Sequence, residues 1–190
     1  SSKSYLNTIV VDINPETWKN IEILLDKFEQ ELNADGLNQT NEQARDNLMR
    51  ASYNFNNSIE DKKIKIADMG EKGARMAAAY YPTSDYVVVD LNDLDNLLNY
   101  VGTVKDIGKF VRDKLEETLR HELTHREQYK KMSKIKDFYT FKLYKYLDYE
   151  QNLVEVVAFH NSFMTFVEKG DLKTVMRLTN EKPQIVANIM

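Results

Sequence analysis

The sequence predicts an α+β fold, in which a small and mainly antiparallel sheet precedes a mostly helical second half. Lysine and isoleucine alternate at residues 63–66, which is the period of a strand. Two further short stretches, 74–81 and 86–90, flank the turn-forming segment 82–85 (Pro-Thr-Ser-Asp) and predict an antiparallel hairpin. After residue 104, apolar residues recur every three or four positions, as they do along one face of a helix.

One strand and two helices are expected before this sheet. Residues 5–13 are rich in Thr, Ile and Val, which favours a strand. Asn14 then caps a helix that has Pro15 at its first position, where a missing backbone N–H costs nothing. A second helix is predicted around residues 42–51, inside a polar stretch. Apolar residues at helical spacing extend the first helix to about residue 33: Trp18, Ile21, Leu24, Leu25 and Phe28.

Five helices are predicted after the hairpin. The first is short and covers residues 90–101, whereas the second is long and covers residues 104–131. An unusually aromatic helix is expected at residues 133–149, and a strongly apolar one at residues 152–167. A last helix is predicted at residues 172–178.

The length of 190 residues suits one compact unit, in which an N-terminal strand and helix region (residues 1–60) packs on a core of residues 61–190. The chain carries 26 basic and 30 acidic side chains, and its net charge of -4 argues against a sequence-independent nucleic-acid binder. No stretch approaches the roughly 18 apolar residues that span a bilayer, so no integral membrane segment is expected. The first residues do not form a signal peptide, and we therefore expect a cytoplasmic protein.

The absence of cysteine limits the chemistry that the chain can support. Disulfides, thiolate metal sites and a cysteine nucleophile are excluded. A metal ion would have to be bound by carboxylates and by the histidines, of which there are three.

The segment from His121 to His125 has the sequence His-Glu-Leu-Thr-His, an H-E-x-x-H motif on a predicted helix. Residues four positions apart lie on one helical face, so both imidazoles can bind one ion. Zinc suits two neutral imidazoles and a carboxylate, and it lowers the pKa of bound water to about 7. Glu122 lies at the edge of that face, where it can take the proton from a metal-activated water and pass it to the leaving amine.

The position of the motif around the helix supports this interpretation. If Leu119 defines the zero angle, Leu115 and Leu123 lie within about 40° of it, whereas His121 and His125 lie about 200° and 240° round the helix. Apolar residues therefore occupy one side and the histidines the other, as expected of a helix that lines a cleft. The alternative is an exposed helix face that happens to carry two histidines.

A catalytic zinc needs a third protein ligand, and Glu155 is the best candidate. Apolar residues surround it in the segment 153–159 (Leu-Val-Glu-Val-Val-Ala-Phe), and a buried carboxylate without a partner costs several kcal/mol or more. A metal ion would offset that cost. Two alternatives remain: Glu155 pairs with a basic side chain or reaches solvent, or Glu150 is the third ligand instead.

These motifs resemble the gluzincin branch of zinc metallopeptidases. The resemblance rests on His121, Glu122 and His125, followed by a downstream helix with a Glu-x-x-Ala pattern at Glu155 and Ala158. The order of hairpin, long active-site helix and glutamate helix is similar to that of minigluzincins and of short zincin-like peptidases of bacteria and phages. The resemblance covers about residues 74–167. Val154 stands where an Asn commonly precedes the glutamate, and Phe159 where an acid commonly follows it.

The resemblance implies a zincin-like fold and a zinc-dependent endopeptidase with Zn²⁺ held by His121, His125 and Glu155 and with Glu122 as general base. It also implies a peptide or protein substrate that binds in extended form along an edge strand, here residues 74–81 or 86–90.

An additional group should stabilise the transition state or line the substrate pocket. The candidates are His160, which lies about 140° round the helix from Glu155, and the tyrosines at 139, 144, 146 and 149, of which Tyr144 and Tyr149 are preferred. For each of them a role in packing or at the surface is the alternative.

Two other functions compete with the peptidase. The chain could be a zincin-fold binding or assembly module with a structural or vestigial metal site. It could also be a non-peptidase metal hydrolase, or a helical interaction protein with coincidental histidines.

Overall fold

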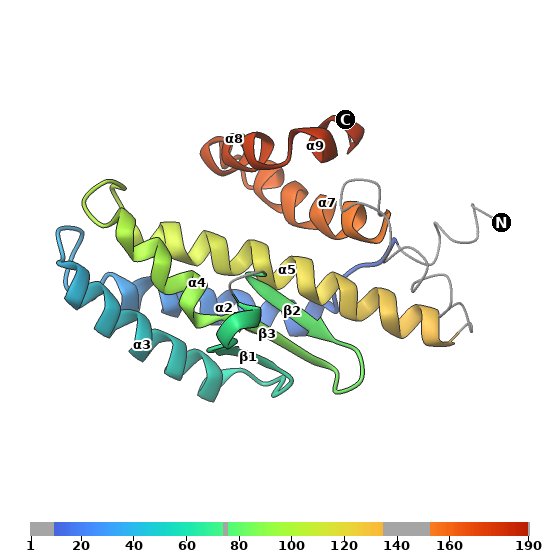
Figure 1. Ribbon diagram of the computed structural model, residues 1–190, viewed down its shortest axis with the longest axis horizontal. Coiled ribbons are helices and arrows are strands. Elements are labelled where there is room, and N and C mark those ends of the chain that lie inside the picture. Colours follow the sequence, from blue (N-terminus) through green and yellow to red (C-terminus); the bar gives the residue numbers. More distant parts are fainter. Residues whose placement is uncertain (1–9, 74–75, 135–152, 190) are drawn as a thin grey trace. The chain divides into compact units, whose positions relative to one another are not determined.

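The computed structural model describes residues 10–73, 76–134 and 153–189, and it is α+β as predicted (Figure 1). The chain forms two compact units. One unit is Asn14–Leu119, and the other combines Arg120–Met190 with Ser1–Ile13. The predicted packing of residues 1–60 on a core of residues 61–190 stays a prediction.

Helix α2 (Pro15–Leu32) begins as predicted. The Asn14 side chain accepts hydrogen bonds from the backbone N–H groups of Glu16 (2.9 Å) and Thr17 (3.2 Å). The five apolar residues that predicted the helix are all buried. Gly36, with a φ of 83°, turns the chain after the helix, in a conformation that favours glycine.

The predicted N-terminal strand does not form in its described part. Residues 10–13 are in no strand, and residues 5–9 lie outside the described ranges. The Val11 carbonyl accepts a hydrogen bond from the Asn161 side chain, at 3.0 Å. A side-chain amide thus takes the place that a backbone N–H of a neighbouring strand would have.

Helix α3 (Asn41–Ser58) is longer than the predicted 42–51. Thr40 and Gln43 form a capping box at its start, since each side chain accepts from the other residue's backbone N–H. The buried face includes Asn47 and Ser52 beside its apolar residues, which weakened the apolar pattern in the sequence. The helix packs against α2 (Figure 1).

The sheet has three strands, β1 (Ile64–Ala67), β2 (Ala78–Tyr81) and β3 (Tyr86–Asp90), in the order β1-β3-β2. The predicted hairpin of β2 and β3 is confirmed, and the strands are antiparallel. The prediction of a mainly antiparallel sheet is wrong, because β1 pairs with β3 in parallel, with Ile64 opposite Val87. After β1 the chain crosses to the far edge, and the hairpin then returns it between the two outer strands.

The predicted helix at 90–101 consists of α4 (Leu91–Asn96) and a 3₁₀ turn, η2 (Leu97–Tyr100). Asp90 caps α4 by accepting from the backbone N–H of Asn92, at 3.3 Å. The long helix predicted at 104–131 is α5 (Ile107–Lys134), which starts in the first unit and ends in the second. Its predicted apolar stripe is buried at five positions and partly buried at Phe110: Ile107, Val111, Leu115, Leu119 and Leu123.

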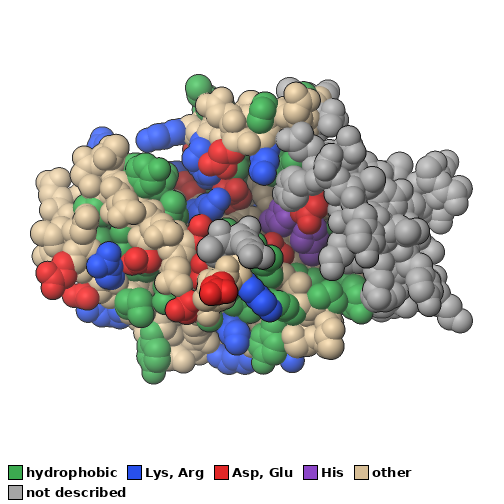
Figure 2. Space-filling model, in the orientation of Figure 1, with side chains coloured by type: hydrophobic (Ala, Val, Ile, Leu, Met, Phe, Trp, Pro, Cys, Tyr) green, Lys and Arg blue, Asp and Glu red, His purple; other side chains and the backbone are tan. Residues whose placement is uncertain are grey.

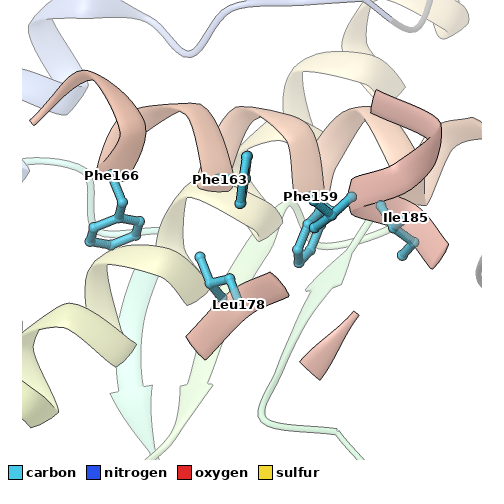
Figure 3. Packing of buried hydrophobic residues seen from close by; sticks show 6 residues of the cluster. Phe159, Phe163, Phe166, Leu178 and Ile185 are labelled. Atoms are coloured by element: carbon cyan, nitrogen blue, oxygen red, sulfur yellow. The ribbon is translucent and has the colours of Figure 1, made fainter. Parts of the chain in front are cut away.

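The second unit contains α7 (Leu153–Glu168), α8 (Leu172–Glu181) and α9 (Pro183–Ile189). The first two were predicted, whereas α9 was not, because its seven residues are too short to show a helical period. Figure 3 shows the hydrophobic cluster that joins the three helices. Its members are Phe159, Phe163, Phe166, Leu178, Ile185 and Val186.

The aromatic helix predicted at 133–149 lies outside the described residues except for its first two positions, which belong to α5. Among the helices that the structure describes, none is both long enough and apolar enough to cross a membrane.

Candidate metal centre

Helix α5 presents the two motif histidines on the side away from its apolar stripe. Leu119 and Leu123 are buried, with 0% and 1% of their surface exposed. His121 and His125 are one turn apart, with ring centroids 4.8 Å apart and ring planes at 85° to each other. Their Nε2 atoms lie 3.1 Å from each other. The spacing of the motif along the helix therefore brings the two ligand atoms together.

Glu155, on the first turn of α7, completes a compact group. Its Oε2 atom lies 2.8 Å from His121 Nε2 and 3.1 Å from His125 Nε2. Among the described residues, this is the group of histidine and acidic side chains whose arrangement can hold a metal ion. Ligand atoms bonded to tetrahedral zinc at about 2.0–2.1 Å are about 3.3 Å apart, so the donor atoms are close to the spacing that zinc requires.

Hydrogen bonding to Gln128 determines which nitrogen of His125 faces this group. The Gln128 Nε2 donates to the Val154 carbonyl at 3.2 Å, which turns its Oε1 toward His125. Since Oε1 can only accept, His125 Nδ1 carries the proton in their 2.9 Å contact. The lone pair of neutral His125 is then on Nε2, the atom that lies next to His121 and Glu155. This is the tautomer that a metal ligand needs.

The electrostatics of the group favour an additional positive charge. Burial disfavours the imidazolium form of His125, but the hydrogen bond and charge of Glu155, together with Glu122, outweigh burial and raise the pKa of His125 to about 9. Burial would raise the pKa of the Glu155 carboxyl, yet the hydrogen bonds from His121 and His125 hold it below its ordinary value. A proton on His125 supplies this charge, and a divalent cation bound by the three atoms would supply it as well.

The three side chains are enclosed but not sealed from solvent. The exposed fractions of the side chains are 17% for His121, 10% for His125 and 25% for Glu155. Figure 2 shows histidine and acidic side chains next to each other on the surface of the drawn face. Solvent therefore reaches part of each of the three side chains.

The other residues predicted for the site lie outside the ligand group or outside the described residues. Glu122 is half-buried, and its charge acts on His125. His160 lies on α7 and is not a member of the ligand group. Its predicted role stays a prediction. The competing ligand Glu150 and the four candidate tyrosines, Tyr144 and Tyr149 included, lie outside the described residues.

The structure also explains one departure from the gluzincin pattern. Phe159, which stands where an acid commonly follows the glutamate, is buried in the hydrophobic cluster of α7, α8 and α9. An acid at this position would bring an unpaired charge into an apolar core.

Of the two strands suggested for binding an extended substrate, only β2 is at an edge of the sheet that the structure describes. β3 is the central strand of the described sheet, so both of its sides are paired and the prediction for residues 86–90 is wrong. β2 forms one edge. The strand suggested at 74–81 begins only at Ala78 within the described residues.

Gln128 is the residue of this centre that the sequence analysis missed. It follows His125 by three positions, a spacing at which two side chains on a helix are neighbours. That spacing is visible in the sequence, but its meaning depends on the contact with α7, which the sequence does not show.

Comparison with known proteins yields no relative: no family model, no curated protein and no solved structure matches this chain.

Proposed function

We propose that this protein is a zinc-dependent endopeptidase of the gluzincin type. The observation that carries the proposal is the convergence of His121 and His125, from an H-E-x-x-H motif, with Glu155 from a separate helix. Two imidazoles and one carboxylate are the ligand set of a group of catalytic zinc sites in peptidases. Glu122 adds the acidic side chain that peptide hydrolysis requires.

Each ligand has a distinct part in holding the ion. The hydrogen bond at Nδ1 of His125 leaves the lone pair on its Nε2 atom, and Nε2 of His121 lies 3.1 Å from that atom. Glu155 brings the negative charge that partly balances a divalent ion. Bound zinc would polarise the scissile carbonyl and lower the pKa of a water molecule to about 7.

Glu122 would act as general base and then as general acid. It takes a proton from the attacking water and delivers it to the nitrogen of the leaving amine. Its half-buried position beside His125 suits this role, because the carboxylate can exchange protons without being a ligand.

The proposed substrate is a peptide or protein segment in extended form. An extended segment can add main-chain hydrogen bonds to the edge of a sheet with little demand on its sequence. β2 is the strand suited to this role, since it is an edge strand of the described sheet.

The decisive experiment combines metal analysis with one substitution. We expect purified protein to contain one zinc ion and to cleave peptides from an unbiased library. Glu122→Gln should retain the zinc and lose activity by about 10²–10⁴-fold, the usual contribution of general acid–base catalysis. Glu127→Gln is the matched control, because it makes the same change on the same helix at a residue that is not in the ligand group. It should leave activity unchanged.

Other outcomes would identify the competing functions. Bound zinc without cleavage of any library peptide would favour a binding or assembly module. Full activity in Glu122→Gln would contradict the mechanism. Stoichiometric iron in place of zinc would contradict the hydrolase, because two histidines and one carboxylate also hold non-haem iron.

A further inference from the structure

Gln128 joins the two helices that supply the candidate ligands. It lies on α5, and none of its surface is exposed to solvent. Its carboxamide accepts from His125 Nδ1 at 2.9 Å and donates to the Val154 carbonyl at 3.2 Å. Val154 directly precedes Glu155 on α7. One buried side chain therefore contacts a ligand from one helix and the residue next to a ligand from the other.

The acceptor side of Gln128 restricts His125 in two ways. It holds the proton on Nδ1, which leaves the Nε2 lone pair for an ion. It also resists rotation of the imidazole ring, because rotation would break the hydrogen bond at Nδ1. Without such an acceptor, a neutral imidazole can carry its proton on either nitrogen. Part of the population would then present an N–H group toward His121 and Glu155, and an N–H group cannot bind a metal.

The donor side of Gln128 restricts α7. The bond from Nε2 to the Val154 carbonyl spans the two helices one residue before the carboxylate ligand. A shift of α7 along α5 would break this bond, so the bond favours the position in which Glu155 Oε2 reaches both imidazoles. The two contacts are thus coupled, because the same carboxamide plane must satisfy both.

We propose that Gln128 is the positioning residue of the metal centre: it holds the proton on Nδ1 of His125 and it fixes the position of Glu155, so that Nε2 and Oε2 are the atoms that face an ion. The inference rests on the proposed metal site and adds to it a residue that does not touch the ion. Preorganised ligands lose less conformational entropy on binding, so the contribution of Gln128 should appear in metal affinity.

The test measures zinc affinity by competition with a chromophoric chelator, in wild type and two variants. Gln128→Met preserves the approximate volume but removes the acceptor and the donor, and we expect zinc to bind about 10–100-fold more weakly. Gln128→Glu keeps an acceptor for the Nδ1 proton but loses the donor to the Val154 carbonyl, so its affinity should lie between those of wild type and Gln128→Met. Partial rescue by the carboxylate separates the effect on His125 from the effect on α7 and from a general effect of core packing.

Asn161→Leu is the matched control. Asn161 is the side-chain amide that joins α5 and α7 elsewhere, since it donates to Thr124 Oγ1 at 3.2 Å as well as to the Val11 carbonyl. It contacts no ligand residue in these bonds. The substitution should lower thermal stability and leave zinc affinity within about twofold of wild type, if the loss in Gln128→Met is specific.

A spectroscopic measurement tests the Nδ1 proton of His125 directly. In zinc-loaded wild type labelled with ¹⁵N-histidine, His125 should show a slowly exchanging proton on Nδ1 and a metal-shifted Nε2. In zinc-loaded Gln128→Met the Nδ1 proton should exchange faster. Should Gln128→Met fail to fold, the wild-type spectrum and Gln128→Glu still decide.

The outcomes separate this inference from the proposed function. Wild-type protein that binds no zinc contradicts the proposed function and, with it, this inference. Zinc that binds wild type and Gln128→Met equally overturns the role of Gln128 alone. Equal losses in Gln128→Met, Gln128→Glu and Asn161→Leu, or coordination of zinc through Nδ1, would also overturn it.

Discussion

The two halves of helix α5 differ in the groups that surround their buried polar side chains. In the first half, Arg112 lies 3.2 Å from the exposed Asp26 and 3.7 Å from each of the buried acids Asp113 and Glu116, so these two acids have a cation supplied by the chain itself. In the second half, two imidazole nitrogens and the Glu155 oxygen lie 2.8–3.1 Å from one another. In neutral His125, with the tautomer that Gln128 favours, Nε2 is an acceptor that faces the Glu155 oxygen, another acceptor.

This difference separates a structural cluster from a ligand set. Buried charges with opposite sign stabilise one another, and a pair of this kind needs nothing from outside the protein. Acceptors that face one another repel unless a proton or a metal ion lies between them. The same helix thus carries a self-sufficient ion-pair cluster and a group suited to binding a cation.

The largest expected effect is the loss of a ligand in the second half. His125→Ala should weaken zinc binding by roughly 10²–10³-fold, because about 10–16 kcal/mol of binding energy is shared among about four ligands. His160→Ala is the control, since this histidine of α7 is outside the group, and its zinc affinity should equal that of wild type. Equal losses in both variants, measured by chelator competition, would remove the distinction between the two histidines.

The next effect breaks the ion-pair cluster in the first half. Arg112→Met should lower the free energy of unfolding by about 3 kcal/mol, since Glu116 is fully buried and loses a cation beside it. Arg45→Met, which breaks an exposed pair with Asp95, should cost less than about 0.5 kcal/mol. Denaturant unfolding measures both. Zinc affinity should not change in Arg112→Met, and a change would show that the two halves are not independent.

Removal of the metal should lower the Tm mainly of those variants whose ligand set is intact. At zinc concentrations about 100-fold above the dissociation constant, binding adds about 2.7 kcal/mol of stability. A chelator should therefore lower the Tm of wild type by roughly 5–10 °C. Arg112→Met should show the same shift from its lower starting point, and His125→Ala should show a shift of at most about 2 °C. A shift in His125→Ala as large as that of wild type would mean that zinc binds elsewhere.

The smallest expected effect concerns pH. Because the pKa of His125 is raised from 6.5 to about 9 in the metal-free group, zinc must displace its proton at neutral pH. Apparent zinc affinity should then rise about tenfold per pH unit between pH 7 and 8 and level off above pH 9. In Glu155→Gln, which lacks the charge that raises this pKa, the levelling should occur at lower pH.

The metal-free protein should show the opposite trend in stability. A folded pKa above the unfolded value stabilises the protein fully below pH 6.5, and this contribution is lost as pH rises through about 9. The lowered pKa of Glu155 contributes stability above its ordinary pKa, and that part is lost only in acid. The free energy of unfolding of protein freed of metal by a chelator, measured at several pH values, tests this trend. A free energy of unfolding that increases from pH 6.5 to 9 would contradict it.

The elements predicted from the sequence are those defined by local signals. The start of α2 follows from Asn14 and Pro15, and the hairpin follows from the turn segment between its strands. Both depend on contacts between residues close in the chain. The full length of α3 was missed because Asn47 and Ser52 interrupt its apolar face, although the helix buries both side chains.

Long-range features were predicted less well. The parallel pairing of β1 with β3 was missed, because a strand's own sequence does not indicate its neighbour. The approach of Glu155 to the histidines was inferred from the cost of burying a carboxylate, not from any local pattern. Gln128 was missed altogether, since its significance depends on a backbone carbonyl 26 positions away.

The sequence by itself determined the main helices, the hairpin and the common face of His121 and His125, because helical periodicity and capping act over a few residues. The tertiary structure decided the strand order, the position of Glu155 beside both imidazoles and the bridge formed by Gln128. The last two depend on how α7 packs against the second half of α5 within one unit. Such packing is a sum of many weak contacts over the whole unit, and no short segment specifies it.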